Sequence, residues 1–183
     1  MSVIHPYVVY WAHMTAVLSK FDIRRLLNMK PPLIEGGIDI ESQLQPNGFD
    51  LTVRDIARLQ TAGTIAISNA QRVVSGLTPL KYDAQGFIDL PPGPYSITYN
   101  EIVHLPNNVM ALARPRSSLL RCGVTVGTAV WDASYSGRSQ SLLVVHNPAG
   151  FLLQKNARVT QLVFLLLTDE TEGYQGIYQG ENT

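Results

Sequence analysis

Glycine and proline recur at short intervals along this 183-residue chain, and after the segment SKFDIRRLL no stretch keeps a helical period for long. The densest turn signal is PPGP at residues 91–94. Between such signals lie runs rich in β-branched and aromatic residues, which favour strands. The clearest runs are YSITYNEIVHL from Tyr95, SLLVVHN from Ser141 and VTQLVFLLL from Val159. Many short strands with frequent turns predict an all-β fold, either a barrel or a jelly-roll.

One helix is expected near the start, in SKFDIRRLL. Ser19 can accept hydrogen bonds from the first backbone N–H groups, and Asp22, three residues later, completes a capping-box pattern. The sequence therefore predicts a short N-terminal helix in front of the β-domain.

The composition limits the size and the partners of the protein. Hydrophobic residues make up 45% of the chain and charged residues 15%, as expected for one folded domain with a core. Lysine plus arginine and aspartate plus glutamate both total 14, so the formal net charge is zero. A protein that binds a nucleic-acid polymer needs a basic excess to displace counterions, so we expect no such partner. A single nucleotide remains open as a ligand.

Cys122 is the only cysteine, which rules out an intrachain disulfide and a cysteine-based zinc site. Its apolar setting predicts a small buried side chain, and the lack of disulfides fits a reducing cytoplasm. The first thirteen residues, MSVIHPYVVYWAH, lack the basic region of a signal peptide and are interrupted by Pro6 and two histidines. We therefore expect a cytoplasmic protein with no membrane partner.

Two short motifs bear side chains suited to chemistry on a nucleotide. In PRSSL, the guanidinium of Arg116 can bind phosphate oxygens at two points, and the hydroxyls of Ser117 and Ser118 add donors. In WDASYSG, Asp132 lies three residues before Tyr135 in a segment of small residues. Each motif alone is weak, because Arg-Ser-Ser is common on protein surfaces and an aspartate in such a segment often caps a turn.

Four segments, QPNGFDL, PRSSL, VGTAVWDASYSG and ARVTQLVF, occur in that order and, with the tail, resemble the motifs of the trimeric dUTPase and dCTP deaminase superfamily. The resemblance begins at about Met14 and is nearest to the deaminase-like dUTPases of archaeal type. It implies a jelly-roll-like, distorted β-barrel, assembled as a homotrimer with active sites at the subunit boundaries. We expect a dispensable extension at 1–13, a barrel domain at 14–169 and a flexible lid segment at 170–183.

One position separates the two activities of this superfamily. Deaminases carry a glutamate ten residues after the motif aspartate, and counting from Asp132 reaches Leu142. Deamination of cytosine needs a group that moves protons, which an alkyl side chain cannot do. The nearby Gln140 carries an amide that does not titrate near neutral pH, and a cysteine-based zinc deaminase is excluded. GFDL, at residues 48–51, resembles the GYDL motif of dUTPases.

The resemblance thus implies a dUTP diphosphatase that converts dUTP to dUMP and pyrophosphate, supplies dUMP and keeps uracil out of DNA. It makes Asp132 the general base for the attacking water, and Asp50 a support for the water and metal network. Mg²⁺ is expected to be carried by the triphosphate rather than by a protein cage. The residues implied in phosphate binding are Arg116, Ser117, Ser118 and Gln161. Arg121 is assigned either to phosphate binding or to trimer contacts.

The segment from Val126 to Trp131 is expected to form a hairpin whose backbone reads the uracil edge, with Gly127 and Ala129 beside the base. Ala129 stands where many dUTPases have glycine. Tyr135 is expected to pack beneath the deoxyribose and to leave no room for a 2′-hydroxyl.

The tail segment YQGIYQG resembles the ending of the deaminases, with Ile177 in place of their lysine. Tyr174, Tyr178 and Gln179 are expected to close over the nucleotide.

Two alternatives stay open at this stage. The first is a dCTP deaminase or a bifunctional deaminase and dUTPase, which Leu142 disfavours unless a glutamate reaches the pocket from elsewhere. The second is a non-catalytic nucleotide-binding regulatory module on the same scaffold. Asp132 and Tyr135 argue against that module, because binding alone needs no base.

Overall fold

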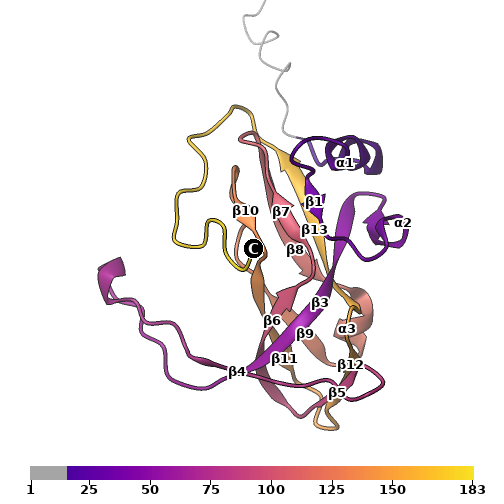
Figure 1. Ribbon diagram of the computed structural model, residues 1–183, viewed down its shortest axis with the longest axis vertical. Coiled ribbons are helices and arrows are strands. Elements are labelled where there is room, and N and C mark those ends of the chain that lie inside the picture. The colour runs from indigo at the N-terminus through magenta and orange to yellow at the C-terminus, as the bar shows by residue number, and fades with distance from the viewer. Residues whose placement is uncertain (1–15) are drawn as a thin grey trace, which may run out of the picture.

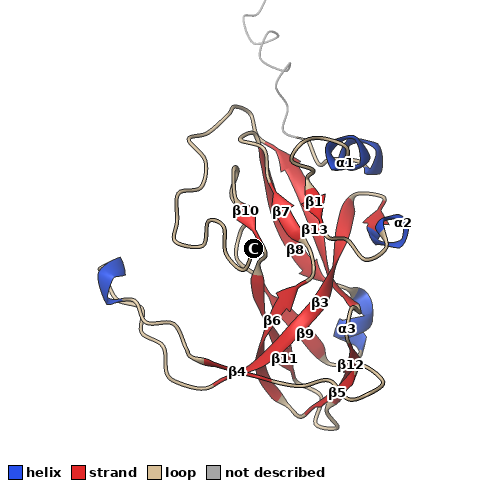
Figure 2. Cartoon of the chain, in the orientation of Figure 1, coloured by secondary structure: helices blue, strands red, loops and turns tan. Residues whose placement is uncertain are grey.

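The computed structural model describes residues 16–183, so the expected extension at 1–13 lies outside the described residues. The described chain is mostly β, and its three α-helices lie along one side of the strands (Figures 1 and 2). The helices are α1 (Lys20–Leu27), α2 (Ile40–Gln43), α3 (Ser117–Arg121) and the 3₁₀ turn η2 (Asn69–Gln71). The strands are β1 (Ile34–Glu35), β2 (Leu44–Gln45), β3 (Gly48–Leu59), β4 (Leu77–Pro79), β5 (Phe87–Leu90), β6 (Gly93–Tyr99), β7 (Ile102–His104), β8 (Val109–Pro115), β9 (Val124–Gly127), β10 (Ser136–Gly137), β11 (Gln140–Val145), β12 (Phe151–Gln154) and β13 (Arg158–Leu166).

The main sheet follows the order β8-β13-β3-β6-β11-β9, and β2 and β4 also pair with β3. Strands β8 and β9, at the two ends of this path, lie against each other, which nearly closes the sheet into a barrel. Two small sheets, β1-β7-β10 and β12-β5, complete the β-structure. The prediction of an all-β barrel is confirmed.

The core forms where strands bury every second side chain. In β6 the buried residues are Tyr95, Ile97 and Tyr99, while the side chains between them are less buried. This period of two is the pattern of a strand with one face against a core. The runs that predicted strands from the sequence become β6 and β7, β11 and β13.

The predicted N-terminal helix is α1, and its capping box is present. Ser19 N donates to Asp22 Oδ2 at 3.1 Å, and Asp22 N donates to Ser19 Oγ at 3.4 Å. Ile23 is fully buried and fixes the helix to the barrel.

Strand β3 runs through the centre of the sheet and begins with the GFDL motif. A side chain at Gly48 would overlap the carbonyl oxygen of Leu162 on β13, so only glycine lets the two strands approach this closely. The register of β3 with β13 then places Asp50 opposite Gln161.

Two expectations from the sequence are corrected here. The segment from Val126 to Trp131 does not pair with itself: β9 pairs with β11, residues 128–130 are irregular, and Trp131 forms an isolated bridge with Ala111. The hairpin is therefore the wide one between β9 and β11. Cys122 is exposed rather than buried, because it is the C-cap residue of α3.

Candidate functional site

The aromatic pocket, of about 460 Å³, lies between the β9–β11 connection and the tail. Its lining residues are Ala129, Val130, Trp131, Asp132, Tyr135, Ser139, Gln140, Tyr174, Tyr178 and Glu181. Six of these were singled out as site residues from the sequence: Ala129, Trp131, Asp132, Tyr135, Tyr174 and Tyr178. The fold therefore brings the WDASYSG motif and the tail tyrosines to one concave site.

Hydrogen bonds fix the inner wall of the aromatic pocket. The indole Nε1 of Trp131 donates to Ser139 Oγ at 2.6 Å, and the hydroxyls of Tyr135 and Ser139 lie 3.0 Å apart. The rings of Tyr135 and Tyr174 meet edge to face, with 5.7 Å between their centres. Both wall aromatics of the motif, Trp131 and Tyr135, are buried. The pocket thus offers preformed aromatic surfaces with few free polar groups on this wall.

Asp132 differs from this wall because it is exposed. Its carboxylate accepts no hydrogen bond from any residue in the range 16–183, although its backbone carbonyl accepts one from Tyr135 N at 3.1 Å. An exposed carboxylate with free lone pairs at the edge of a pocket can accept a proton from a water molecule.

Glu181 is a second carboxylate in the aromatic pocket, and sequence reasoning missed it. The hydroxyl of Tyr135 donates to Glu181 Oε1 at 2.8 Å. Burial raises the pKa of the Glu181 carboxyl, and the hydrogen bond from Tyr135 opposes this rise. Burial likewise raises the pKa of the Tyr135 hydroxyl, so this hydroxyl stays a donor at neutral pH. No local spacing points to Glu181, because only the path of the tail brings it here.

The tail reaches the pocket through a close crossing at Gly173. A side chain at Gly173, whose φ is +76°, would collide with Ser134. Just beyond this crossing, Tyr174 N donates to Ala133 O at 2.8 Å. Gln179 does not line the pocket: its side chain accepts from Ser136 N and donates to Ser134 O, both at 2.9 Å. Gln179 therefore attaches the tail to the WDASYSG segment at Ser134 and Ser136.

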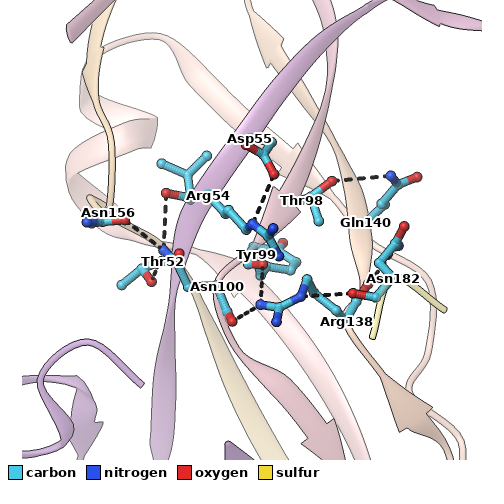
Figure 3. Close-up of polar contacts among 11 residues, drawn as sticks. Thr52, Arg54, Asp55, Thr98, Tyr99, Asn100, Arg138, Gln140, Asn156 and Asn182 are labelled. Carbon is cyan, nitrogen blue, oxygen red and sulfur yellow. Dashed lines mark hydrogen bonds and ion pairs between the residues drawn. The ribbon is translucent and has the colours of Figure 1, made fainter. Parts of the chain in front are cut away.

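Arg138 holds the end of the tail against the barrel (Figure 3). Its Nε donates to Asn182 O at 3.0 Å, and its Nη1 donates to the carbonyl oxygens of Tyr99 and Asn100. The amide of Asn182 donates back to Arg138 O at 2.9 Å. Burial lowers the pKa of this guanidinium, which nevertheless remains charged at any physiological pH. Arg138 thus joins the tail to the corner between β6 and β7.

Arg138→Gln is expected to free the end of the tail and leave the barrel folded. Hydrogen bonds from a charged group contribute about 1.5–3 kcal/mol each, so amide hydrogen exchange at Gly180 and Glu181 should accelerate by roughly 10- to 100-fold. Arg54→Gln is the matched control, because within residues 16–183 Arg54 forms an ion pair with the neighbouring exposed Asp55 alone. Equal exchange in the two variants would contradict the anchoring role.

The remaining polar residues from the sequence form a second group, the arginine–serine cluster. Its members are Asp50, Arg116, Ser117, Ser118, Arg121, Arg158 and Gln161. Asp50 Oδ2 lies 3.1 Å from Arg116 Nε and 3.4 Å from Arg158 Nη1, although only 1% of the Asp50 side chain is exposed. Burial raises the pKa of Asp50, and the two guanidinium groups oppose this rise. Arg158 was not assigned to the site from the sequence, and its pairing with Asp50 within one chain emerges only from the structure.

The donors of this cluster face solvent. Pro115 ends β8, α3 begins at Ser117, and the buried Leu119 fixes α3 to the barrel. The side chains of Ser117, Ser118 and Arg121 are exposed. Exposed hydroxyl and guanidinium donors beside a buried carboxylate form a surface that suits phosphate oxygens.

The aromatic pocket and the arginine–serine cluster are separate in one chain. In Figure 1, α3 lies on one side of β3, whereas β10 and the tail lie on the other. Gly127 belongs to neither group; it ends β9 opposite Leu142 of β11. The structure therefore divides the predicted site residues into two half-sites.

Residues 16–183 contain no cluster of three or more His, Cys, Asp or Glu side chains that could hold a metal ion. Among these same residues, no helix has the length and apolar character needed to cross a bilayer.

The barrel is similar to a solved structure of a nucleotide-modifying protein. The crystal structure of 2′-deoxycytidine 5′-triphosphate deaminase from Agrobacterium tumefaciens superposes with a TM-score of 0.62 at 18% sequence identity. The match covers 83% of this chain but only 48% of that chain, so our chain corresponds to about half of it. The fold is thus that of the deaminase-type β-barrels. The family model described as dCTP deaminase-like matches residues 17–167, and the chain belongs to this family.

Curated relatives extend over nearly the whole chain. A protein from Methanosarcina mazei named "Probable deoxyuridine 5′-triphosphate nucleotidohydrolase" is 52% identical over 169 residues, which are 92% of this chain and 99% of the relative. A protein of the same name from Archaeoglobus fulgidus is 48% identical over 167 residues, covering 91% and 98%. The deoxyuridine 5′-triphosphate nucleotidohydrolase of Methanocaldococcus jannaschii is 37% identical over 141 residues, covering 76% and 89%.

Proposed function

We propose that this protein is a dUTP diphosphatase, which hydrolyses dUTP to dUMP and pyrophosphate. The observation that carries this function is the exposed carboxylate of Asp132, which accepts no hydrogen bond from residues 16–183 and lies at the edge of the aromatic pocket. Relatives of up to 52% identity bear the matching name. Leu142, which stands where deaminases carry a glutamate, also supports hydrolysis over deamination. It lies on β11, is 41% exposed and does not line the pocket. The enzyme would act in the cytoplasm, where it supplies dUMP and keeps uracil out of DNA.

The chemistry follows from the residues of the two half-sites. Asp132 orients a water molecule and accepts its proton as the water attacks the α-phosphorus. Trp131 and the backbone around Ala129 face the uracil, while the Tyr135 ring packs against the deoxyribose. Tyr174 and Tyr178 cover the nucleotide as the lid. Catalysis of this kind consists mainly of positioning and charge stabilisation.

The phosphates need the arginine–serine cluster, and it must come from a second copy of the chain. Because this cluster and the aromatic pocket lie on different sides of one barrel, one nucleotide meets both only at a boundary between subunits. Arg116, Ser117, Ser118 and Gln161 of one copy would then hold the phosphates of a nucleotide whose base lies in the pocket of its neighbour. Arg121 lies beside them. Three copies related by a closed rotation give three such sites, in a homotrimer.

Magnesium fits this site as an ion carried by the substrate. The donor set offers the exposed carboxylate of Asp132 and, in the arginine–serine cluster, the buried carboxylate of Asp50, whose Oδ2 is paired with Arg116 and Arg158. Two separate carboxylates cannot replace the several oxygen ligands that Mg²⁺ requires, so phosphate oxygens and waters would provide the rest. When bound, the ion would neutralise phosphate charge, and Asp50 would support the water network.

A second candidate, deamination of dCTP, is favoured by one observation. Glu181 brings a carboxylate of raised pKa into the aromatic pocket, and such a group can move protons. It ranks second because the Glu181 carboxylate already accepts a hydrogen bond from the Tyr135 hydroxyl.

Product analysis with Mg²⁺ tests both candidates when dUTP and dCTP are supplied separately. We expect dUMP and pyrophosphate from dUTP, and no ammonia from dCTP. Ammonia from dCTP would instead establish the second candidate. If neither nucleotide were consumed, both would be refuted. Asp132→Asn protein purified in the same way controls for contaminating phosphatases.

A further inference from the structure

Residues 60–76 form an arm that projects away from the barrel between β3 and β4 (Figure 1). Its side chains include Ile65, which is 84% exposed, and Ile67, which is fully exposed. Val73 and Val74 are each more than half exposed. Arg72 is the only charged residue in the arm. An exposed apolar surface of this kind marks a contact surface on a soluble protein.

The arm has little to stabilise it within its own chain. Thr64 and Val73 exchange two backbone hydrogen bonds, of 2.7 and 2.9 Å, and Gln60 N donates to Gly76 O at 2.7 Å. A two-stranded ribbon alone is at best marginally stable in water, because it cannot bury an apolar face. The exposed isoleucines and valines would supply such a face only if another surface covered them.

The base of the arm lies at the mouth of the aromatic pocket. A groove of about 550 Å³ between the arm and the barrel is lined by Ile65 and Val73, among others, and also by Gln140 and Tyr178. Gln140 and Tyr178 line the aromatic pocket as well. The guanidinium of Arg72 lies 5.9 Å from the centre of the Tyr178 ring. Any molecule that approaches the pocket mouth therefore approaches the arm.

We propose that the arm binds a second copy of this chain, namely the copy whose arginine–serine cluster completes the site at this aromatic pocket. This inference rests on the composite site proposed above, because that site places a neighbouring subunit at the pocket mouth. The chemistry of the arm fits a protein surface. One cation among seventeen residues is too little for a nucleic acid or an anionic membrane, whereas exposed isoleucine and valine side chains suit an apolar protein face.

The test is sedimentation of the full chain carrying Ile65→Ser together with Ile67→Ser. Both side chains are exposed in the single chain, so the barrel should keep its stability. Loss of two apolar contacts from the interface should raise the concentration at which half of the protein is assembled by at least about tenfold. Phe21→Ser is the matched control, because Phe21 is 79% exposed on α1, at the opposite end of the molecule from the arm. The control should assemble like the unaltered protein.

Three outcomes would overturn the inference: unchanged assembly of the double variant, an unaltered protein that stays monomeric at every concentration, or flotation of the unaltered protein, but not the variant, with phosphatidylcholine vesicles. Hydrolysis of dUTP by the unaltered protein is measured in parallel. If it hydrolyses dUTP while the variant assembles normally, only the arm inference fails. If it assembles through the arm but hydrolyses no dUTP, only the proposed function fails.

Discussion

Asp132→Asn is expected to lower kcat for dUTP hydrolysis by about 10²- to 10⁴-fold, the usual contribution of a positioned general base. An amide keeps the size of the carboxylate and one acceptor oxygen, but it replaces the other oxygen with an NH₂ donor and cannot accept the proton of the attacking water. Because the Asp132 side chain is exposed and accepts no hydrogen bond from residues 16–183, the free energy of unfolding should change by less than about 0.5 kcal/mol. Steady-state kinetics and urea denaturation measure the two quantities separately.

The matched control for this substitution is Asp169→Asn, which changes an exposed carboxylate just beyond β13 and outside the aromatic pocket. It should leave both kcat and stability unchanged. A full rate of hydrolysis in Asp132→Asn would refute the base assignment. A loss of activity accompanied by unfolding would likewise contradict it, because the substitution would then act on the fold.

The second large effect is the recovery of activity when two inactive variants are mixed. Asp132→Asn lacks the proposed base, and Arg116→Ala lacks the guanidinium proposed to bind the phosphates. Each variant alone should therefore be nearly inactive. In trimers assembled at random from equal amounts of both, about a quarter of the composite sites combine an intact Asp132 with an intact Arg116 from the neighbour. Co-expression with two different affinity tags yields such mixed trimers. Their dUTP hydrolysis should approach a quarter of the rate of the unaltered protein.

A chain that carries both substitutions provides the control. Mixed with Asp132→Asn, it supplies no intact Asp132, so no site should recover. Absence of recovery in verified mixed trimers of the single variants would show that one chain contains the whole site. Arg116→Ala should itself fold, because Arg158 still pairs with the buried Asp50 at 3.4 Å.

The strands could be predicted from the sequence because their burial is local. Ile97 and Leu143 alternate with less buried neighbours, as the period of a half-buried strand requires. The capping box of α1 joins residues only three positions apart, Ser19 and Asp22, so it could also be predicted from the sequence. Resemblance supplied what periodicity cannot, namely which polar residues belong to the site.

The far wall of the aromatic pocket could not be predicted, because it depends on contacts between distant residues. Tyr135 and Glu181 are separated by 46 residues, and Arg138 and Asn182 by 44. No spacing rule connects residues over such distances. The wide hairpin was missed for a related reason: β9 pairs with β11 rather than with its own continuation. Exposure of Cys122 follows from its place at the end of α3, which apolar composition does not reveal.

The position of the tail in the chain separates folding of the barrel from completion of the pocket. Every strand of the barrel precedes residue 167, but Tyr174 and Glu181 follow it and form part of the pocket wall. All the strands can therefore be in place before the pocket is complete, because the tail adds its wall when Asn182 binds Arg138. The same arrangement makes the connection after β13 a point of control. A protease that cuts there would remove the wall of the pocket and leave every strand in place.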